Sequence, residues 1–98
     1  MPWVYILRCA DDTFYVGYTD DLVSRLRWHR LGLAANHTAL RLPVDLAYKE
    51  EFPSPEAAIR RERQLKRWSA KKKAALIAGN RPLLRHLSKR RRPGRGTR

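Results

Sequence analysis

Residues 3–19, WVYILRCADDTFYVGYT, constrain the fold of this chain more than any other stretch. Two short apolar runs, Val4–Leu7 and Phe14–Val16, are rich in β-branched and aromatic residues and flank the polar segment CADDT. Short apolar runs separated by a few turn-forming residues predict a β-hairpin. The runs are apolar almost without interruption, which indicates that both faces of the hairpin are covered, as helices would cover them. We therefore expect a small sheet packed between helices.

The next segments predict one helix and one further strand. Thr19 or Asp20 can cap a helix from about Asp21 to Leu31, and a glycine at position 32 suits the residue that follows its end. Residues 32–43 show no periodicity and are predicted to form a loop. Residues 44–52, VDLAYKEEF, are predicted to form a third strand.

The last segments predict helices only. Ser54 can cap a helix from Pro55 to about Trp68, because proline is favoured in the first helical turn. Ser69 can cap a second helix that ends at Gly79, and PLLRHL can form a short final helix. The order ββαβαα predicts an α+β fold with a small, three-stranded, largely antiparallel sheet flanked by helices.

Ninety-eight residues are enough for one small domain. Residues 88–98, SKRRRPGRGTR, contain no apolar side chain and are dense in Arg and Gly. Such a segment cannot bury enough surface to offset the entropy of ordering. The sequence therefore predicts a folded domain over residues 1–87 and a disordered basic tail over residues 88–98.

The charge of the chain indicates its partner. Twenty-two Lys and Arg against nine Asp and Glu give a net charge of +13 and a pI near 11.1. A strongly basic chain attracts polyanions, and nucleic acid is the first expectation. No apolar run approaches the 18 or so residues of a membrane span, and the first residues do not resemble a signal peptide. With a single cysteine, Cys9, a cytoplasmic location is expected.

The helix predicted after Ser54 contains a carboxylate in an unusual position. Ala58, Ile59 and Leu65 lie on one side of a helical wheel, and Glu62 falls in the middle of that arc. A carboxylate in an apolar stripe costs free energy unless something pairs with it. One interpretation is a glutamate at the edge of the core that reaches water or a structural arginine. The other is a ligand for a hard cation such as Mg²⁺, which often takes only one or two carboxylates.

The first predicted helix carries Arg25 and His29, four residues apart and therefore on one face. An arginine fork matches phosphate oxygens, and an imidazole can move a proton near neutral pH. A solvated surface pair is the more ordinary explanation of this spacing taken alone. Trp28 and Trp68 can either stack on nucleic-acid bases or pack in the core.

Basic residues gather in the stretch RRERQLKRWSAKKK, which holds eight of the 22 Lys and Arg. A charge run is most often a solvated helical face, but this clustering favours a surface that binds the phosphate backbone. The candidate nucleic-acid-binding residues are Arg60, Arg61, Arg63, Lys66, Arg67, Lys71, Lys72 and Lys73.

Taken together, these residues resemble a known signature. Trp3-Val4-Tyr5 followed by Tyr15-Val16-Gly17 resembles the GIY-YIG nuclease motif. Arg25 and then His29 follow at the family's spacing, and Glu62 lies on the helix where the family keeps a metal-binding glutamate. The sequence is most similar to the small stand-alone bacterial members, over roughly residues 2–77. It departs from the pattern at Trp3, which replaces a glycine, and at Tyr18, where some members have lysine.

The resemblance implies an endonuclease that hydrolyses phosphodiester bonds with one divalent metal, Mg²⁺ or Mn²⁺, held by Glu62. It implies that the two tyrosines share one face of the sheet and that Arg25 neutralises charge on the phosphate. Tyr5 is the expected acceptor of the water proton, provided that cationic neighbours lower its pKa. Tyr15 and His29 would orient the water and the phosphate, with His29 as an alternative base. Glu62 is expected within reach of both phenols and Arg25.

Three functions remain to be distinguished at this point. The first is a metal-dependent GIY-YIG endonuclease that acts on DNA more than on RNA, with branched or damaged DNA as the candidate substrate and DNA repair as the setting. The second is a catalytically weak member that binds nucleic acid as an accessory module. The third is a structural basic protein, such as a ribosome-associated one. The presence of all five site residues favours the first function, and Glu62 in an apolar stripe argues against the third.

Overall fold

The computed structural model describes residues 1–89. Contacts between residues divide the chain into two units, Met1–Arg67 and Trp68–Arg98, and each is described by itself. The first unit contains the sheet and the second contains two helices. All five candidate site residues therefore lie in the first unit.

The sheet has three strands, β1 (Trp3–Arg8), β2 (Phe14–Thr19) and β3 (Asp45–Glu51). Their order is β2-β1-β3, and both pairs are antiparallel. The predicted hairpin and third strand are confirmed, and both hairpin strands are longer than expected. Since β1 is central, β2 is an edge strand whose outer side is free of sheet neighbours.

Three helices complete the first unit: α1 (Leu22–Arg30), α2 (Asn36–Ala39) and α3 (Pro55–Lys66). The Asp21 carboxylate accepts a hydrogen bond from the Ser24 backbone at the start of α1, and the Ser54 hydroxyl accepts one from Ala57 at the start of α3. Both helices were predicted close to these bounds, and Ser54 caps α3 as predicted, but the prediction that Thr19 or Asp20 caps α1 was wrong, since Asp21 does so. The prediction of a loop over residues 32–43 was wrong for α2, a single helical turn that no side chain caps.

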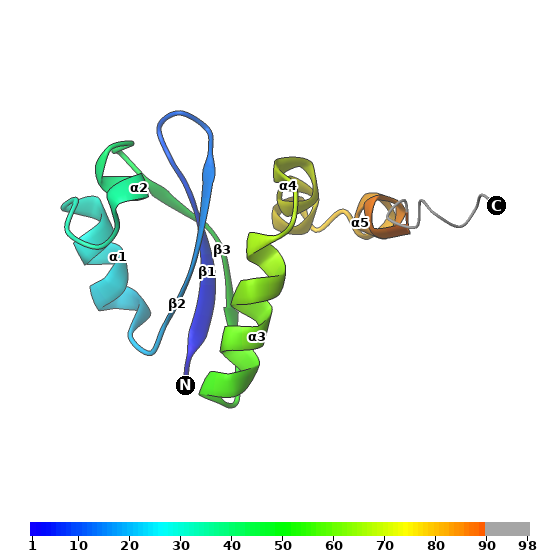
Figure 1. The fold of residues 1–98 in the computed structure, drawn as a ribbon, viewed down its shortest axis with the longest axis horizontal. Helices are drawn as coiled ribbons and strands as arrows, with labels where there is room; N and C mark the ends of the chain where they lie inside the picture. The colour runs from blue at the N-terminus through cyan, green and yellow to red at the C-terminus, as the bar shows by residue number, and fades with distance from the viewer. Residues whose placement is uncertain (90–98) are drawn as a thin grey trace. The chain divides into compact units, whose positions relative to one another are not determined.

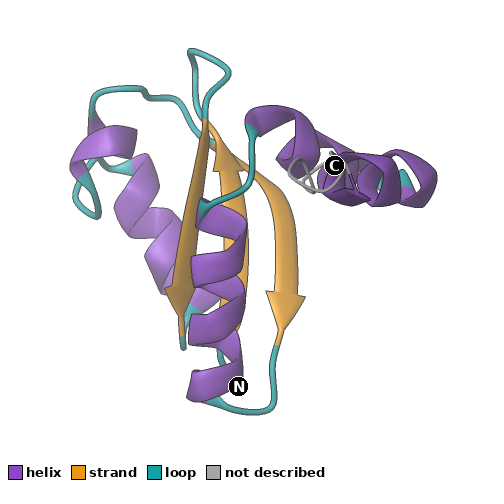
Figure 2. Cartoon of the chain, turned by 45° about the vertical axis from the view of Figure 1, so that its right-hand side comes forward, coloured by secondary structure: helices purple, strands orange, loops and turns teal. Residues whose placement is uncertain are grey.

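Helices α1 and α3 cover opposite faces of the sheet (Figure 1; Figure 2). On the α1 side, the buried residues Tyr5, Leu7, Cys9 and Val44 form a cluster, against which Tyr15, Leu22, Leu26 and Leu46 pack. Successive strand residues point to opposite faces, so the fully buried Val4 and Ile6 face α3. The expected sheet between helices is therefore confirmed.

The second unit consists of α4 (Ala70–Ala78) and α5 (Arg81–Lys89). The Ser69 hydroxyl caps α4, and Gly79 ends it in the left-handed conformation with φ 70°, both as predicted. Helix α5 is longer than the predicted segment and includes residues 88 and 89, which had been assigned to the tail. The remainder of the predicted tail, residues 90–98, lies outside the described residues.

Candidate active site

The Tyr5 phenol lies across the neighbouring strand at Gly17. The two residues are partners in the β1–β2 register, and Tyr5 is fully buried. A Cβ at position 17 would overlap the phenol oxygen and Cζ of Tyr5. Glycine at this strand position therefore leaves the space that the tyrosine ring occupies.

The phenol oxygen of Tyr5 lies 2.7 Å from Nε2 of His29, a histidine of α1 with an exposed fraction of only 1%. On the other side of the ring, His29 Nδ1 lies 2.9 Å from the hydroxyl oxygen of Thr38 in α2. The Thr38 hydroxyl in turn donates to the backbone carbonyl of Ala35 at 3.1 Å. One buried chain of hydrogen bonds therefore joins the sheet to α1 and α2.

Burial determines the protonation of this pair. It raises the pKa of Tyr5 to about 12, with a further rise caused by Tyr15, while the charge of Arg25 acts in the opposite direction. Burial, followed by Arg25, lowers the pKa of His29 to about 4. Arg25 lowers the Tyr5 pKa, as expected of a cationic neighbour, but loss of water outweighs the guanidinium, so the pKa is raised overall. At neutral pH the pair is a neutral phenol and a neutral imidazole.

Tyr15 lies on the same face of the sheet as Tyr5, because it pairs with Leu7, two residues along β1. The two tyrosines are diagonal neighbours rather than direct partners. The Tyr15 ring lies 5.2 Å from the ring of His29 and 6.0 Å from that of His37, measured between centroids. The resemblance had implied a shared face for the tyrosines, and the geometry agrees.

Arg25 stands at the exposed surface of α1, on the same helix as His29. Together with Trp28, Leu33 and Ala34 it lines an open pocket of about 400 Å³. Trp28 is 50% exposed, so this tryptophan is not a core residue. The pocket therefore places an aromatic face beside a guanidinium.

Glu62 approaches from α3, the helix on the other side of the sheet from α1 (Figure 1). Its side chain is 20% exposed, and its Oε2 pairs with Lys66 Nζ at 3.3 Å. Its charge contributes to the raised pKa of Tyr5, so the carboxylate acts on that phenol electrostatically. Glu62 is therefore not part of the α1-side cluster, but its charge acts on Tyr5, which belongs to that cluster.

A metal site at Glu62 would use few protein ligands. Within residues 1–89, no three His, Cys, Asp or Glu side chains come together as a metal-binding group. Mg²⁺ is often bound by one or two carboxylates, with water and substrate phosphates completing the shell. A single glutamate fits a site of that kind.

The five candidate residues meet at Tyr5. His29 is its hydrogen-bond partner, and the charges or potential charges of Tyr15, Arg25 and Glu62 all act on its pKa. Helix α1 supplies the arginine and the histidine, the hairpin supplies the tyrosines, and α3 supplies the glutamate. The centre of the arrangement is the Tyr5 phenol, which lies against Gly17 of the edge strand β2.

Comparison with known proteins identifies this arrangement. A family model of the GIY-YIG catalytic domain matches residues 1–75. The chain belongs to the GIY-YIG family. The match covers every candidate residue of the site, from Tyr5 to Glu62, and it ends within α4. The resemblance in the two tripeptides is thereby confirmed over most of the chain.

Relatives of this GIY-YIG chain include UPF0213 proteins of archaea and bacteria. It is 43% identical over 76 residues to one from Natronomonas pharaonis, covering 78% of this chain and 89% of the relative. It is 48% identical over 77 residues to one from Streptococcus pyogenes, covering 78% and 84%. The fold is similar to the solution NMR structure of a UPF0213 protein from Bacillus halodurans, with a TM-score of 0.53, 40% identity and coverage of 80% and 84%. The predicted similarity to the small stand-alone members of the family is confirmed.

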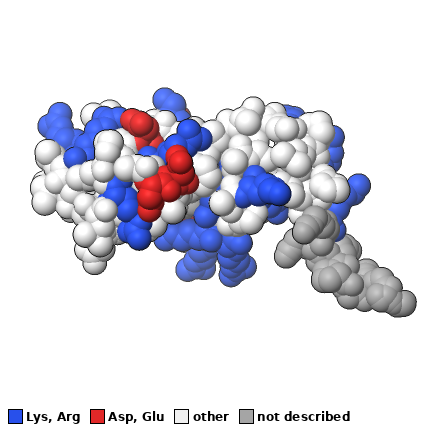
Figure 3. Space-filling view, turned by 90° about the horizontal axis from the view of Figure 1, so that it is seen from above, with Lys and Arg blue, Asp and Glu red and all other residues white. Residues whose placement is uncertain are grey.

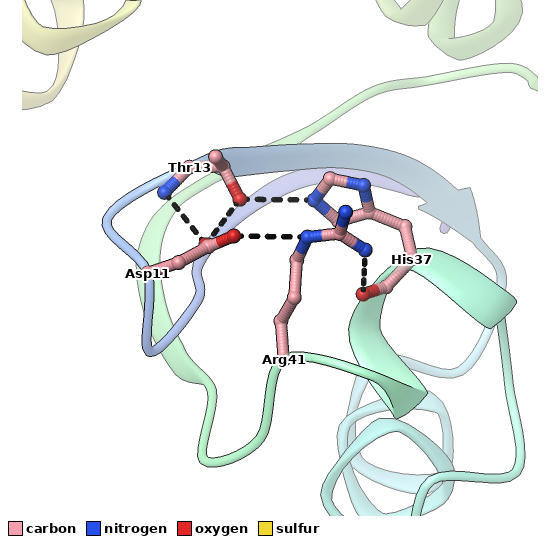
Figure 4. A network of polar contacts seen from close by, with 4 residues as sticks. All are labelled: Asp11, Thr13, His37 and Arg41. Carbon is pink, nitrogen blue, oxygen red and sulfur yellow. Dashed lines mark hydrogen bonds and ion pairs between the residues drawn. The ribbon is translucent and has the colours of Figure 1, made fainter.

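A second polar network joins the hairpin turn to α2 (Figure 4). Asp11 accepts hydrogen bonds from the backbone and hydroxyl of Thr13 and from Arg41 Nε, the last at 2.9 Å. Arg41 also donates to the His37 carbonyl, and the His37 ring lies 3.0 Å from the Thr13 hydroxyl. These contacts fasten α2 to the end of the sheet. We call the four residues Asp11, Thr13, His37 and Arg41 the turn clamp.

The eight candidate nucleic-acid-binding residues divide between the two units. Those in the first are Arg60, Arg61, Arg63, Lys66 and Arg67, and those in the second are Lys71, Lys72 and Lys73. One face of the molecule shows basic side chains spread widely and acidic ones gathered in one area (Figure 3). Each unit therefore carries part of the expected set of basic residues.

Some of these basic side chains already have structural partners. Arg61 pairs with Glu50 at 3.3 Å and donates to Gln64, which ties α3 to β3. Lys72 Nζ lies 4.2 Å from the centroid of the Trp68 ring. Trp68 is thus engaged with a lysine, whereas Arg60 and Arg63 are exposed on α3.

Sequence reasoning missed Thr38 and the turn clamp. Both depend on α2, a four-residue helix without a side-chain cap or an acidic first turn, so no sequence signal marked it. His37 had been given no role, yet its ring stacks near Tyr15. No helix in residues 1–89 has the length and apolar character needed to cross a bilayer.

Proposed function

We propose that this chain is a metal-dependent endonuclease that hydrolyses phosphodiester bonds in DNA, with branched or damaged DNA as the class of substrate. The supporting observation is that the buried Tyr5 phenol interacts with all four other candidate residues, by a hydrogen bond to His29 and by charge with the rest. Membership of the GIY-YIG family supports a nuclease-type function for this constellation.

The protonation of Tyr5 and His29 favours a proton relay over an ionised phenol. With a pKa of about 12, only about one Tyr5 phenol in 10⁵ is ionised at pH 7. A neutral His29 can instead receive the phenol proton through the 2.7 Å hydrogen bond. Because Tyr5 is fully buried in the substrate-free chain, its phenol oxygen would take a proton from the attacking water once DNA binding admits that water to the ring. As the water O–H bond breaks, its oxygen bonds to phosphorus and the P–O bond to the leaving oxygen breaks. The leaving oxygen takes a proton from solvent, and the His29 imidazolium returns its proton to solvent through Tyr5.

The remaining residues would act on the phosphate. The exposed Arg25 guanidinium can neutralise charge on the non-bridging oxygens, as a preorganised donor. Glu62 would hold Mg²⁺ or Mn²⁺, which supplies Lewis-acid stabilisation of the phosphate and the leaving oxygen. Tyr15, beside the His29 ring, would orient the water or the phosphate.

The surface beside the site can bind DNA without recognising its base sequence. The exposed arginines of α3, Arg60 and Arg63, can contact backbone phosphates, and such contacts are independent of sequence. The pocket between Arg25 and Trp28 can receive a base that is not paired, because aromatic faces stack on any base. A preference for unpaired or distorted DNA follows from these two features.

Labelled branched and linear DNA, incubated with Mg²⁺, Mn²⁺ or a chelator, tests this function. We expect metal-dependent cleavage by the full chain, which Glu62→Gln lowers by at least about 10²-fold while DNA binding is kept. Glu56→Gln, in the first turn of the same helix, is the matched control and should cleave normally. Binding without cleavage by the unaltered chain would refute the enzyme and favour an accessory nucleic-acid-binding module.

A further inference from the structure

We propose that Thr38 is a positioning residue that holds the buried His29 in the tautomer with its proton on Nδ1. The catalytic consequence of this assignment rests on the proposed nuclease function, whereas the tautomer itself follows from the hydrogen-bond geometry. Thr38 is fully buried, and its hydroxyl oxygen lies 2.9 Å from His29 Nδ1.

The direction of the Thr38–His29 hydrogen bond follows from the other bond that the hydroxyl makes. Thr38 donates its only hydroxyl proton to the carbonyl oxygen of Ala35, which can only accept. The hydroxyl oxygen therefore presents lone pairs alone to the imidazole. His29 Nδ1 must be the donor, so it carries a proton.

The direction of the Tyr5–His29 hydrogen bond then follows in the same way. A neutral imidazole with a proton on Nδ1 has a lone pair on Nε2. The Tyr5 hydroxyl must then donate to Nε2 across the 2.7 Å contact. His29 is 1% exposed and Tyr5 fully buried, so bulk water does not compete for either nitrogen.

This order of donors matters for the proton relay. The opposite tautomer would point an N–H at the Tyr5 oxygen, and Nε2 could not receive the phenol proton. In the assigned tautomer, the proton passes from Tyr5 to Nε2, and the resulting imidazolium keeps its Nδ1–H bonded to Thr38. Thr38 touches neither substrate nor the attacking water in this scheme and acts through His29 alone.

The turn clamp fastens α2, and with it Thr38, to the hairpin turn. The turn clamp joins Asp11 and Thr13 of the hairpin turn to His37 and Arg41, which flank Thr38 in sequence. The histidine and the threonine that it contacts therefore sit on separate elements that are each fastened to the sheet. A hydroxyl at position 38 can thus set the tautomer without an adjustment of α1.

The test measures the His29 ring nitrogens directly by ¹⁵N NMR on the full chain at neutral pH, without nucleic acid. We expect a protonated Nδ1 and an unprotonated Nε2 in the unaltered protein and in Thr38→Ser. Thr38→Val keeps the shape of the side chain but removes the hydroxyl, and it should give the Nε2–H tautomer or a mixture. Ser69→Ala, which removes a hydroxyl that caps α4 in the second unit, is the control and should leave the His29 tautomer unchanged.

Cleavage assays on the same variants test the consequence. We expect kcat to fall by about 10²-fold or more in Thr38→Val, to recover in Thr38→Ser, and KM to change little, because a positioned base contributes about 10²–10⁴. An Nε2–H tautomer in the unaltered protein, or an unchanged tautomer in Thr38→Val, would overturn the proposal. Since the NMR arm needs no activity, absence of cleavage with the expected tautomers would refute the nuclease function and leave the Thr38 assignment intact.

Discussion

Replacing Gly17 with alanine should destabilise the protein, although alanine is ordinarily the better strand residue. Glycine in a strand interior costs about 0.5–1 kcal/mol relative to alanine, and Gly17 has no positive φ that would penalise a side chain. The simple expectation is therefore a small gain in stability. The structure predicts the opposite sign, because the new Cβ would overlap the oxygen and Cζ of the Tyr5 ring.

The expected size follows from two contributions. Overpacking of a filled site costs about 1–3 kcal/mol. Displacement of the ring also breaks the buried Tyr5–His29 hydrogen bond, whose net contribution is about 0.5–1.5 kcal/mol. Together they cost about 1.5–4.5 kcal/mol, and subtracting the gain of about 0.5–1 kcal/mol for replacing glycine leaves a net loss of about 0.5–4 kcal/mol. A loss of that size lowers the Tm of a domain this small by about 2–30 °C.

Thermal unfolding of a double-mutant cycle would test this reasoning. Tyr5→Leu removes the overlapping ring, so Gly17→Ala should cost much less in that background, with a coupling energy above about 1 kcal/mol. Gly79→Ala is the control, because its Cβ would meet nothing and its cost is confined to the left-handed backbone. A stabilised Gly17→Ala protein, or additive effects of the two substitutions, would refute the proposed contact.

Three further predictions concern pH, base stacking and salt. Because folding lowers the pKa of His29 from 6.5 to about 4, the unfolded chain binds a proton between these pH values that the folded chain does not. About 3 kcal/mol of the free energy of unfolding is therefore present above pH 6.5 and is lost as the pH falls to about 4. Urea unfolding should show this dependence of stability on pH, and an unchanged dependence in His29→Gln would contradict it. Trp28→Leu should weaken single-stranded DNA binding by about 5- to 150-fold, and Trp28→Phe by less, in a fluorescence titration; an equal loss for duplex DNA would argue against stacking. Replacing Arg60 and Arg63 with glutamine should each reduce the slope of log affinity against log salt by about 0.9 if each contacts one phosphate; an unchanged slope would remove that residue from the interface.

The parts of the fold that follow from local sequence signals were predictable. Ser54 and Ser69 mark the starts of α3 and α4 because their side chains can accept backbone hydrogen bonds, and the structure shows both bonds. Gly79 ends α4 because glycine readily adopts the left-handed conformation that follows a helix. The hairpin followed from apolar runs on either side of a polar turn. Each of these signals depends on only a few neighbouring residues, so it can be recognised from the sequence alone.

The electrostatics of the site were not predictable in the same way. The pKa of Tyr5 depends on how completely the chain removes water from the ring, and burial is a property of the assembled core. Thr38 gave no signal because its partners, His29 and Ala35, are brought to it by tertiary packing. Glu62 belongs to α3, and which face of the sheet α3 covers is likewise a property of the assembled fold that the helical wheel does not reveal.

The burial of Cys9 has a practical consequence for following this protein on DNA. The thiol is 3% exposed and burial raises its pKa, so it should form thiolate rarely and alkylate slowly. The chain contains no other cysteine. A cysteine introduced at an exposed arginine of α3 would accordingly be the fast-reacting thiol, and a fluorophore or cross-linker could be attached there without first altering the native core.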